Sequence, residues 1–168
     1  MSSMLAIIAL GSNVGDSQSI LVRAIDKLAQ LSALPLSKSS LWQTTPVDCP
    51  PGSPLFINAV VGLVPRAGET PESLLEKLLA LEKEFGRRSK LVVNEPRRLD
   101  LDLIAFGAEI RNSPAITLPH PRAHTRRFVL QPLAEFAPDL ALPGQTRTVA
   151  RLLEALPATE RLIRLGQL

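Results

Sequence analysis

Two amphipathic helical segments, each flanked by segments of strand type, limit most strongly the folds open to this chain. Apolar residues recur at helical spacing from about residue 17 to 32. A second helix is predicted over 71–86, because Thr70 can cap its start and Gly86 can end it. Short runs rich in apolar or β-branched residues predict strands at 5–10, 37–44, 55–64 and 99–106.

The order of these segments predicts an α+β ferredoxin-like sandwich, β-α-β-β-α-β. Further helices predicted at 128–136 and 149–156 form a C-terminal helical extension. The 168 residues, 45 % of them apolar, are enough for one core, so we expect a single domain over 1–168.

The location of the protein is predicted from its apolar runs. The first, 4–10, has no basic residue before it and is interpreted as a strand rather than a signal peptide. No run approaches the length that spans a bilayer, so we expect a cytoplasmic protein that does not bind membranes. The single cysteine, Cys49, excludes an internal disulfide and a cysteine-rich zinc site.

Positive charge is concentrated in one part of the chain. Residues 87–127 contain nine Lys or Arg and four Asp or Glu, a net charge of 9 − 4 = +5, whereas the whole chain carries +3. Such an excess suits an anionic partner such as phosphate or nucleic acid. A solvated basic face is the alternative that charge alone leaves open.

The strongest local motif is Arg97-Arg98-Leu-Asp100-Leu-Asp102-Leu, at the start of the fourth predicted strand. Because side chains alternate along a strand, the leucines should face the core and both acids the opposite face. Two neighbouring carboxylates suit Mg²⁺ together with substrate phosphates, and nearby arginines would complete a phosphate clamp. Two solvated acids on an exposed face remain the alternative.

A second cluster, at 119–128, contains two histidines and three arginines. Its prolines disfavour the helix that a zinc pair of His120 and His124 would need, so contacts to phosphate oxygens are the better interpretation. An ordinary surface turn remains possible. The chain has no P-loop motif, and the segment 11–15 is consistent with a plain strand-to-helix turn.

Phe56 and Asn58 should share one face of the third predicted strand. An aromatic ring beside a carboxamide could hold a flat heterocycle by stacking and hydrogen bonding. A core phenylalanine and a turn-capping asparagine would give the same pattern.

Together these segments resemble the 6-hydroxymethyl-7,8-dihydropterin pyrophosphokinase family, over most of the chain from Ala6 to about Leu142. The stretches that carry the resemblance are A-L-G-S-N-V-G-D at 9–16, T-T-P-V at 44–47, F-I-N-A-V at 56–60, L-E-K-E-F-G-R at 81–87, P-R-R-L-D-L-D-L at 96–103 and P-H-P-R-A-H-T-R-R-F-V-L-Q-P-L at 119–133. The combination is far more specific than any single piece. The resemblance implies a ferredoxin-like fold and transfer of diphosphate from ATP to the pterin hydroxymethyl group, with AMP as the second product.

The resemblance also implies a role for individual residues. Asp100 and Asp102 would hold two Mg²⁺ ions, and Arg87 and Arg97 would act in catalysis on the ATP phosphates. The other implied ATP-binding residues are Glu82, Thr117, His120 and Arg126, and the implied pterin-binding residues are Thr44, Thr45, Val47, Phe56, Asn58 and Phe128. The implied partners are ATP and the hydroxymethyl-dihydropterin, and we expect a monomer.

The chain departs from the family pattern in residues 88–96. Ser89 stands where a second arginine is usual, and Asn94 and Glu95 replace an aromatic residue and a glycine. These changes bear on closure of the loop and on turnover rate more than on substrate binding. They leave an alternative, a pterin- or nucleotide-binding relative with weak or altered transfer activity. A nucleic-acid-binding module is disfavoured, because the chain has no tyrosine and no RNP-type strand motif.

Overall fold

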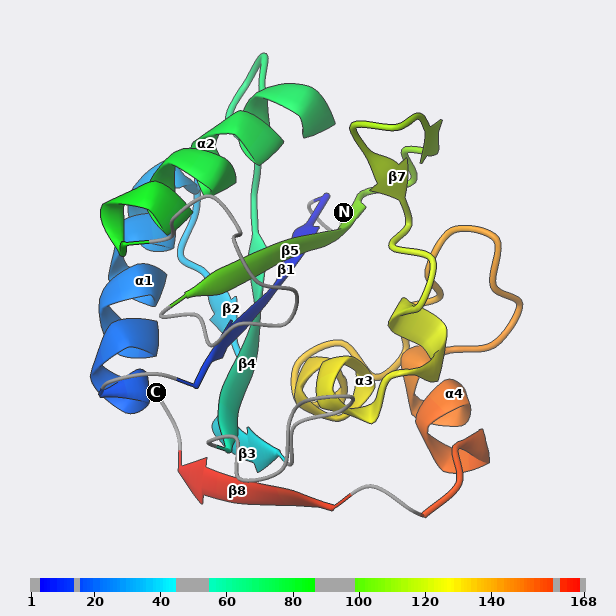
Figure 1. The fold of residues 1–168 in the computed structure, drawn as a ribbon. Coiled ribbons are helices and arrows are strands. Elements are labelled where there is room, and N and C mark those ends of the chain that lie inside the picture. The colour runs from blue at the N-terminus through cyan, green and yellow to red at the C-terminus, as the bar shows by residue number, and fades with distance from the viewer. Residues whose placement is uncertain (1–3, 14–15, 45–54, 87–98, 159–160, 167–168) are drawn as a thin grey trace.

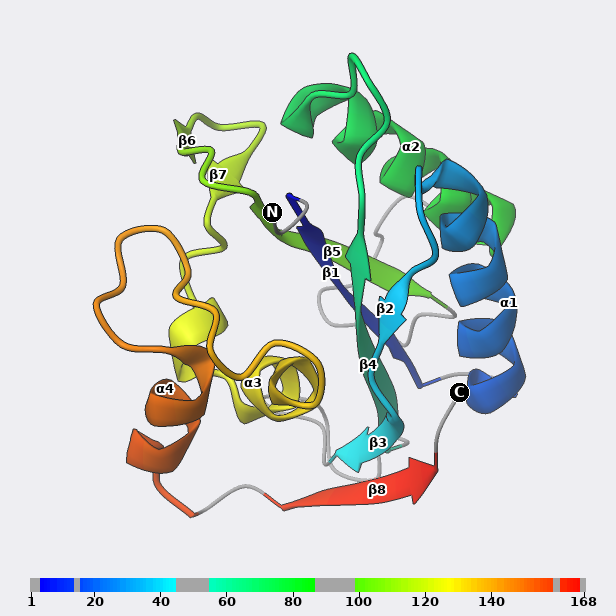
Figure 2. The same cartoon turned by 180° about the vertical axis from the view of Figure 1, so that it is seen from behind.

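The chain forms a mixed α/β fold around one antiparallel sheet (Figures 1 and 2). The computed structural model describes residues 4–13, 16–44, 55–86, 99–158 and 161–166. The six strands described in this sheet are β1 (Ala6–Ser12), β2 (Ser37–Lys38), β3 (Leu41–Thr44), β4 (Phe56–Leu63), β5 (Asp100–Phe106) and β8 (Leu162–Gly166). Their order across the sheet is β5-β1-β4-β3-β8, and β2 also pairs with β4.

Helices cover both faces of the sheet. The described helices are α1 (Ser17–Leu31), α2 (Pro71–Glu84), η1 (Ala123–Thr125), α3 (Arg127–Ala134) and α4 (Val149–Ala155). Both views place α1 and α2 on one side of the sheet and α3 and α4 on the other (Figures 1 and 2). The predicted start of α2 is confirmed, since Thr70 caps the helix, Pro71 is its first residue, and Thr70 and Ser73 form a reciprocal capping box.

The two faces of the sheet pack into two apolar clusters, as the alternation of strand side chains requires. In β1, Ile8 and Leu10 belong to the cluster that contains buried residues of α1 and α2, here called the α1 and α2 cluster. Ile7 belongs to the cluster that contains buried residues of α3 and α4, here called the α3 cluster. Burying one such aliphatic side chain stabilises the fold by about 1.5–3 kcal/mol relative to leaving it exposed to water. The sheet is therefore fixed from both sides, and its position decides where the polar residues on its strands can lie.

Strand β5 contains a bulge that changes its side-chain pattern. Ile8 of β1 lies opposite Leu103, but the preceding Ile7 lies opposite Ala105, so Ile104 is an extra residue. As a result Ile104 and Ala105 both belong to the α3 cluster, and Phe106 returns to the α1 and α2 cluster. The bulge lies two residues beyond the predicted acid pair.

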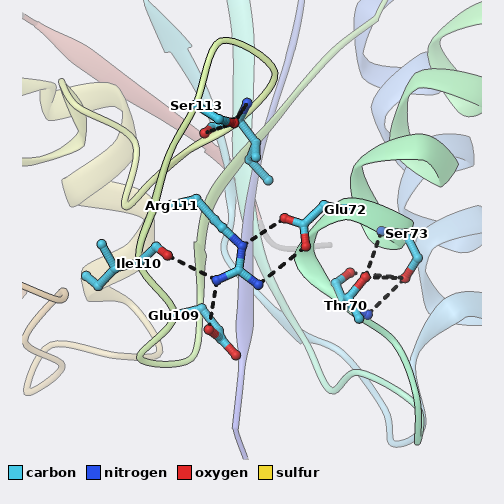
Figure 3. Close-up of polar contacts among 8 residues, drawn as sticks. Thr70, Glu72, Ser73, Glu109, Ile110, Arg111 and Ser113 are labelled. Carbon is cyan, nitrogen blue, oxygen red and sulfur yellow. Dashed lines mark hydrogen bonds and ion pairs between the residues drawn. The ribbon is translucent and has the colours of Figure 1, made fainter.

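A small hairpin follows β5. Its strands are β6 (Arg111–Asn112) and β7 (Thr117–Leu118). Figure 3 shows the Arg111 guanidinium between Glu72 of α2, at 2.8 and 3.3 Å, and Glu109, at 2.9 Å. Hydrogen bonds from Arg111 hold the pKa of the exposed Glu72 below its ordinary value. They tie the hairpin to the start of α2, although exposed pairs add little stability.

The structure corrects two predictions of secondary structure. The strand predicted at 37–44 is two strands, because the six residues from Ser37 to Trp42 lie opposite only five, from Gly62 to Asn58. The C-terminal extension is not purely helical, because α4 is followed by β8, which pairs with β3 at the edge of the sheet. A lone edge strand gains its hydrogen bonds only from a distant partner, so local sequence does not reveal it.

Candidate active site

The predicted acid pair lies on β5, as alternation requires. Leu99, Leu101 and Leu103 are buried in the α1 and α2 cluster, and the half-buried Asp100 and Asp102 face the other way. In the sheet register Asp100 lies opposite Gly11 of β1, and Asp102 lies opposite Ala9. Both acids therefore stand opposite residues of β1 that have no side chain or only a methyl group.

Across β1 from the acids lie the residues predicted to hold a ring. Asn58 of β4 is the register partner of Gly11, and Phe56 lies on the same face two residues earlier. The Asn58 amide donates from Nδ2 to Thr44 Oγ1 at 2.7 Å, and both side chains are buried. Thr44 thus fixes the carboxamide, a relation that the motif at 44–47 did not reveal.

Phe128, the other predicted ring-binding residue, lies in the first turn of α3. It packs against the α3 cluster, and the Arg126 guanidinium lies over its ring, 5.4 Å from the ring centre. This geometry is that of a cation–π contact. It brings a residue predicted for the pterin directly against one predicted for the nucleotide phosphates.

His120 is attached to the bulge of β5. Its backbone N–H donates to the Ile104 carbonyl at 2.8 Å, and its ring Nδ1 accepts from the Arg122 N–H at 3.2 Å. Burial, together with the positive charges of Arg126 and Arg122, lowers the pKa of His120. The ring is therefore neutral at pH 7 and above, and its remaining proton is on Nε2, where it can be donated to an anion.

Glu82 and Thr117 take different positions. Glu82 continues the apolar stripe of α2 and is only 1 % exposed, and its carboxylate accepts a 2.8 Å hydrogen bond from the Leu101 N–H. It thus contacts the backbone between the two acids. Thr117 is exposed on β7.

Four predicted site residues, Arg87, Arg97, Thr45 and Val47, lie outside the described residues, as does the altered segment 88–96. A cavity of about 510 Å³ lies between α1 and the end of α2. The described residues that line it are Ile20, Arg23, Asp26, Lys27, Glu84, Phe85 and Gly86, so none of the predicted site residues is among them. The candidate site is the sheet face instead, because both basic and acidic side chains line this cavity and neither Asp100 nor Asp102 is among its described lining residues.

The described residues thus bring three kinds of group to one face of the sheet. These are a fixed carboxamide with an aromatic neighbour, two carboxylates, and a neutral imidazole near an arginine. Such a combination can hold a flat heterocycle beside a phosphorylated ligand. Within the described ranges, no group of three or more His, Cys, Asp or Glu forms a ready-made metal cage.

Comparisons with known proteins agree with this chemistry. The chain is 39 % identical over 154 residues to the 2-amino-4-hydroxy-6-hydroxymethyldihydropteridine pyrophosphokinase of Synechocystis sp.. This alignment covers 92 % of the chain and 77 % of the Synechocystis protein. It is 38 % identical to the Pseudomonas aeruginosa protein of the same name, over 89 % of this chain and 90 % of that one. The chain is therefore an enzyme of the pyrophosphokinase class.

The family is shown by a second comparison. Residues 7–138 match the model of the 7,8-dihydro-6-hydroxymethylpterin-pyrophosphokinase (HPPK) family, and the chain belongs to this family. The family predicted from the motifs is confirmed. The matches favour the enzyme over the alternative of a binding relative.

Solved structures share the fold. The chain superimposes on the Plasmodium falciparum HPPK-DHPS A437G variant with a TM-score of 0.69 and 14 % identity, over 91 % of this chain and 45 % of that one. The chain thus spans less than half of that protein. At this identity the likeness concerns the fold alone, which is mixed α/β with an antiparallel sheet. Among the described residues, no helix is both long and apolar enough to cross a membrane.

Proposed function

We propose that this protein transfers the diphosphate of ATP to 6-hydroxymethyl-7,8-dihydropterin in folate biosynthesis. The pterin hydroxymethyl oxygen attacks the β-phosphorus of ATP, the bond from that phosphorus to the α-phosphate oxygen breaks, and AMP leaves. The hydroxyl proton is released, and the product is the pterin diphosphate. The observation that carries the proposal is the row of register partners that joins Asn58, across Gly11, to Asp100.

The pterin would bind at the Asn58 end of this row. Phe56 and Phe128 would enclose the ring, and Asn58, held by Thr44, would read its polar edge. The fixed Asn58 amide favours one orientation of the pterin, because the opposite edge of the ring would leave the buried donor or acceptor of Asn58 unpaired. The family resemblance adds Thr45 and Val47 to this set.

The ATP phosphates would bind near the acid end. His120 would donate from Nε2, and Arg126 would supply positive charge from beside Phe128. The resemblance adds Arg87 and Arg97 as catalytic residues and Thr117 near the ribose and base. We assign Glu82 to this region as well, because its carboxylate accepts a hydrogen bond from the Leu101 N–H between the two acids.

Asp100 and Asp102 fit a site for Mg²⁺. They are half-buried oxygen donors on one face of β5, and Mg²⁺ typically uses one or two carboxylates together with substrate phosphates. Two bound ions would neutralise charge on the transferring phosphates. The protein's own part is to hold the two carboxylates at fixed positions along a sheet strand.

The antiparallel order β5-β1-β4-β3, with α1 and α2 on one face, supports the ferredoxin-like assignment for the described elements from β1 to β5. Pairing of β8 with β3 supports a single domain, because it returns the C-terminal segment to the same sheet. The monomeric state and the cytoplasmic location stay predictions.

The test is product analysis with hydroxymethyl-dihydropterin, ATP and Mg²⁺. The unaltered protein should form AMP and pterin diphosphate one to one, and Asp102→Ala should lose this activity. Asp139→Ala, which removes an exposed acid far along the chain, serves as the matched control and should keep it. If the unaltered protein binds the pterin but forms no AMP, the proposal is wrong.

A further inference from the structure

The central member of the row that joins the two halves of the site has no side chain. Gly11 lies directly opposite Asn58 on one neighbouring strand and Asp100 on the other. Register partners in antiparallel strands point to the same face, so both polar side chains stand beside the bare Gly11 backbone. The next residue of β1 on this face, Ala9, is also small. A substituent that passes from the carboxamide to the acids must cross β1 here.

The space over Gly11 is narrow. A Cβ added to Gly11 would lie 3.1 Å from Asn58 Oδ1 and 3.8 Å from Phe56 Cδ1. The Asn58 side chain cannot easily move away, because its Nδ2 is held by Thr44 at 2.7 Å. A methyl group at this position would therefore occupy the surface between the proposed ring site and the acids.

The backbone does not require glycine at this position. Among the glycines that the structure describes, those with positive φ are Gly68, Gly86, Gly107, Gly144 and Gly166. Gly11 is not among them, so an alanine could adopt its extended conformation without strain. The reason for a small residue at Gly11 is thus spatial, and it lies on the face of the proposed site.

We propose that Gly11 determines substrate specificity by leaving room for a short, unbranched alcohol arm between the heterocycle and the phosphates. The inference rests on the proposed function, since it concerns the same pterin and the same reaction. It adds a residue to which that proposal gives no role. The enzyme should therefore accept a primary alcohol on a single carbon and reject a branched arm.

The first experiment measures the dissociation constants of the pterin and of ATP for Gly11→Ala. One methyl group in a close-fitting site changes affinity by about 10-fold to 200-fold. We expect the pterin to bind at least about 10-fold more weakly, and ATP to bind within about twofold of the unaltered protein.

The matched control is Gly62→Ala, on β4 and on the same face of the sheet. A Cβ there would meet Phe136 at 3.2 Å and Leu5 at 3.3 Å, in the packed core beneath α3. It should lower the melting temperature without changing the ratio of pterin to ATP affinity. A loss of pterin affinity in both variants would show a general effect of packing and would overturn the inference.

A second experiment uses the unaltered protein, so it does not depend on the folding of a variant. A pterin whose arm carries one extra methyl, a secondary alcohol, should bind at least about 10-fold more weakly than the hydroxymethyl compound. Equal binding of the two pterins overturns the inference, as does unchanged pterin affinity in Gly11→Ala. The proposed function fails separately, if the unaltered protein forms no AMP from the hydroxymethyl compound.

Discussion

The backbone N–H of His120 donates a 2.8 Å hydrogen bond to the carbonyl of Ile104, the extra residue in the bulge of β5. The bulge therefore fixes the start of the 120–126 segment relative to Asp102, two residues earlier on the same strand. A regular strand would place the Ile104 carbonyl differently, because a bulge bends and twists the strand locally. In this protein the irregularity links the proposed phosphate-binding residues to the acid pair.

The protonation of His120 predicts how stability depends on pH. Its pKa in the folded protein lies below the ordinary 6.5, so the unfolded chain takes up a proton first as the pH falls. The contribution of neutral His120 to the free energy of unfolding is complete above pH 6.5, and it is lost as the pH falls through the pKa of the folded state. Urea unfolding at pH 7.5 and pH 5 should show a larger loss of stability for the unaltered protein than for His120→Gln. Equal losses would contradict the prediction.

The Glu82 carboxylate predicts a loss of both stability and activity on truncation. Glu82→Ala would remove the acceptor of the buried Leu101 N–H, at a cost of about 1–3 kcal/mol. AMP formation should fall by more than stability explains, because Leu101 stands between the two acids. Glu82→Gln keeps an acceptor oxygen and should recover part of both. If Glu82→Gln is as damaging as Glu82→Ala, the negative charge matters rather than this hydrogen bond.

Glu135 at the end of α3 joins three parts of the fold. It accepts hydrogen bonds from the Ser40 N–H at 2.9 Å, the Ser40 hydroxyl at 2.8 Å and the Trp42 indole at 2.7 Å. Arg164 of β8 also donates to the Ser40 hydroxyl at 2.8 Å. Glu135→Ala should destabilise the protein by about 2–3 kcal/mol, because it leaves several donors unpaired.

Trp42 is the chain's single tryptophan, so its fluorescence reports on this network directly. The emission of folded Glu135→Ala should differ from that of the unaltered protein. Glu154→Ala is the control, since it breaks an exposed pair with Arg151 and should cost less than about 0.5 kcal/mol. If Glu135→Ala and Glu154→Ala lower the free energy of unfolding by similar amounts, the prediction for the Glu135 network is wrong.

The stacking of Arg126 on Phe128 predicts that the two substrate sites are coupled. Phe128→Leu should weaken pterin binding by about 10-fold or more, through loss of the aromatic surface. It should also weaken ATP binding by a few fold, because Arg126 loses a contact worth about 0.5–1 kcal/mol. Phe128→Tyr keeps the ring and should spare ATP. Calorimetric titration with each ligand separates the two effects, and unchanged ATP affinity in Phe128→Leu would exclude the coupling.

Much of the fold could be predicted from local sequence. Apolar periodicity located α1 and α2, and alternation placed Leu101 in the core with Asp100 and Asp102 on the opposite face. These predictions succeed because a helix or a strand repeats its pattern over neighbouring residues. The same alternation placed Phe56 and Asn58 on one face, and both contact the space over Gly11.

Long-range pairing could not be predicted in this way. The partner of β8 is β3, about 120 residues earlier, and nothing near Leu162 indicates it. The bulge at Ile104 depends on how β1 lies against β5, so the sequence of β5 alone predicts a regular strand.

The sequence by itself determined the residue types of the site and the family to which the chain belongs, since motifs are local strings of residues. Only the tertiary structure decided that Gly11 separates Asn58 from Asp100, that Thr44 fixes the Asn58 amide, and that Glu82 holds the backbone between the acids. Each of these relations joins segments that are distant in the chain, and their distances are set by sheet register and core packing.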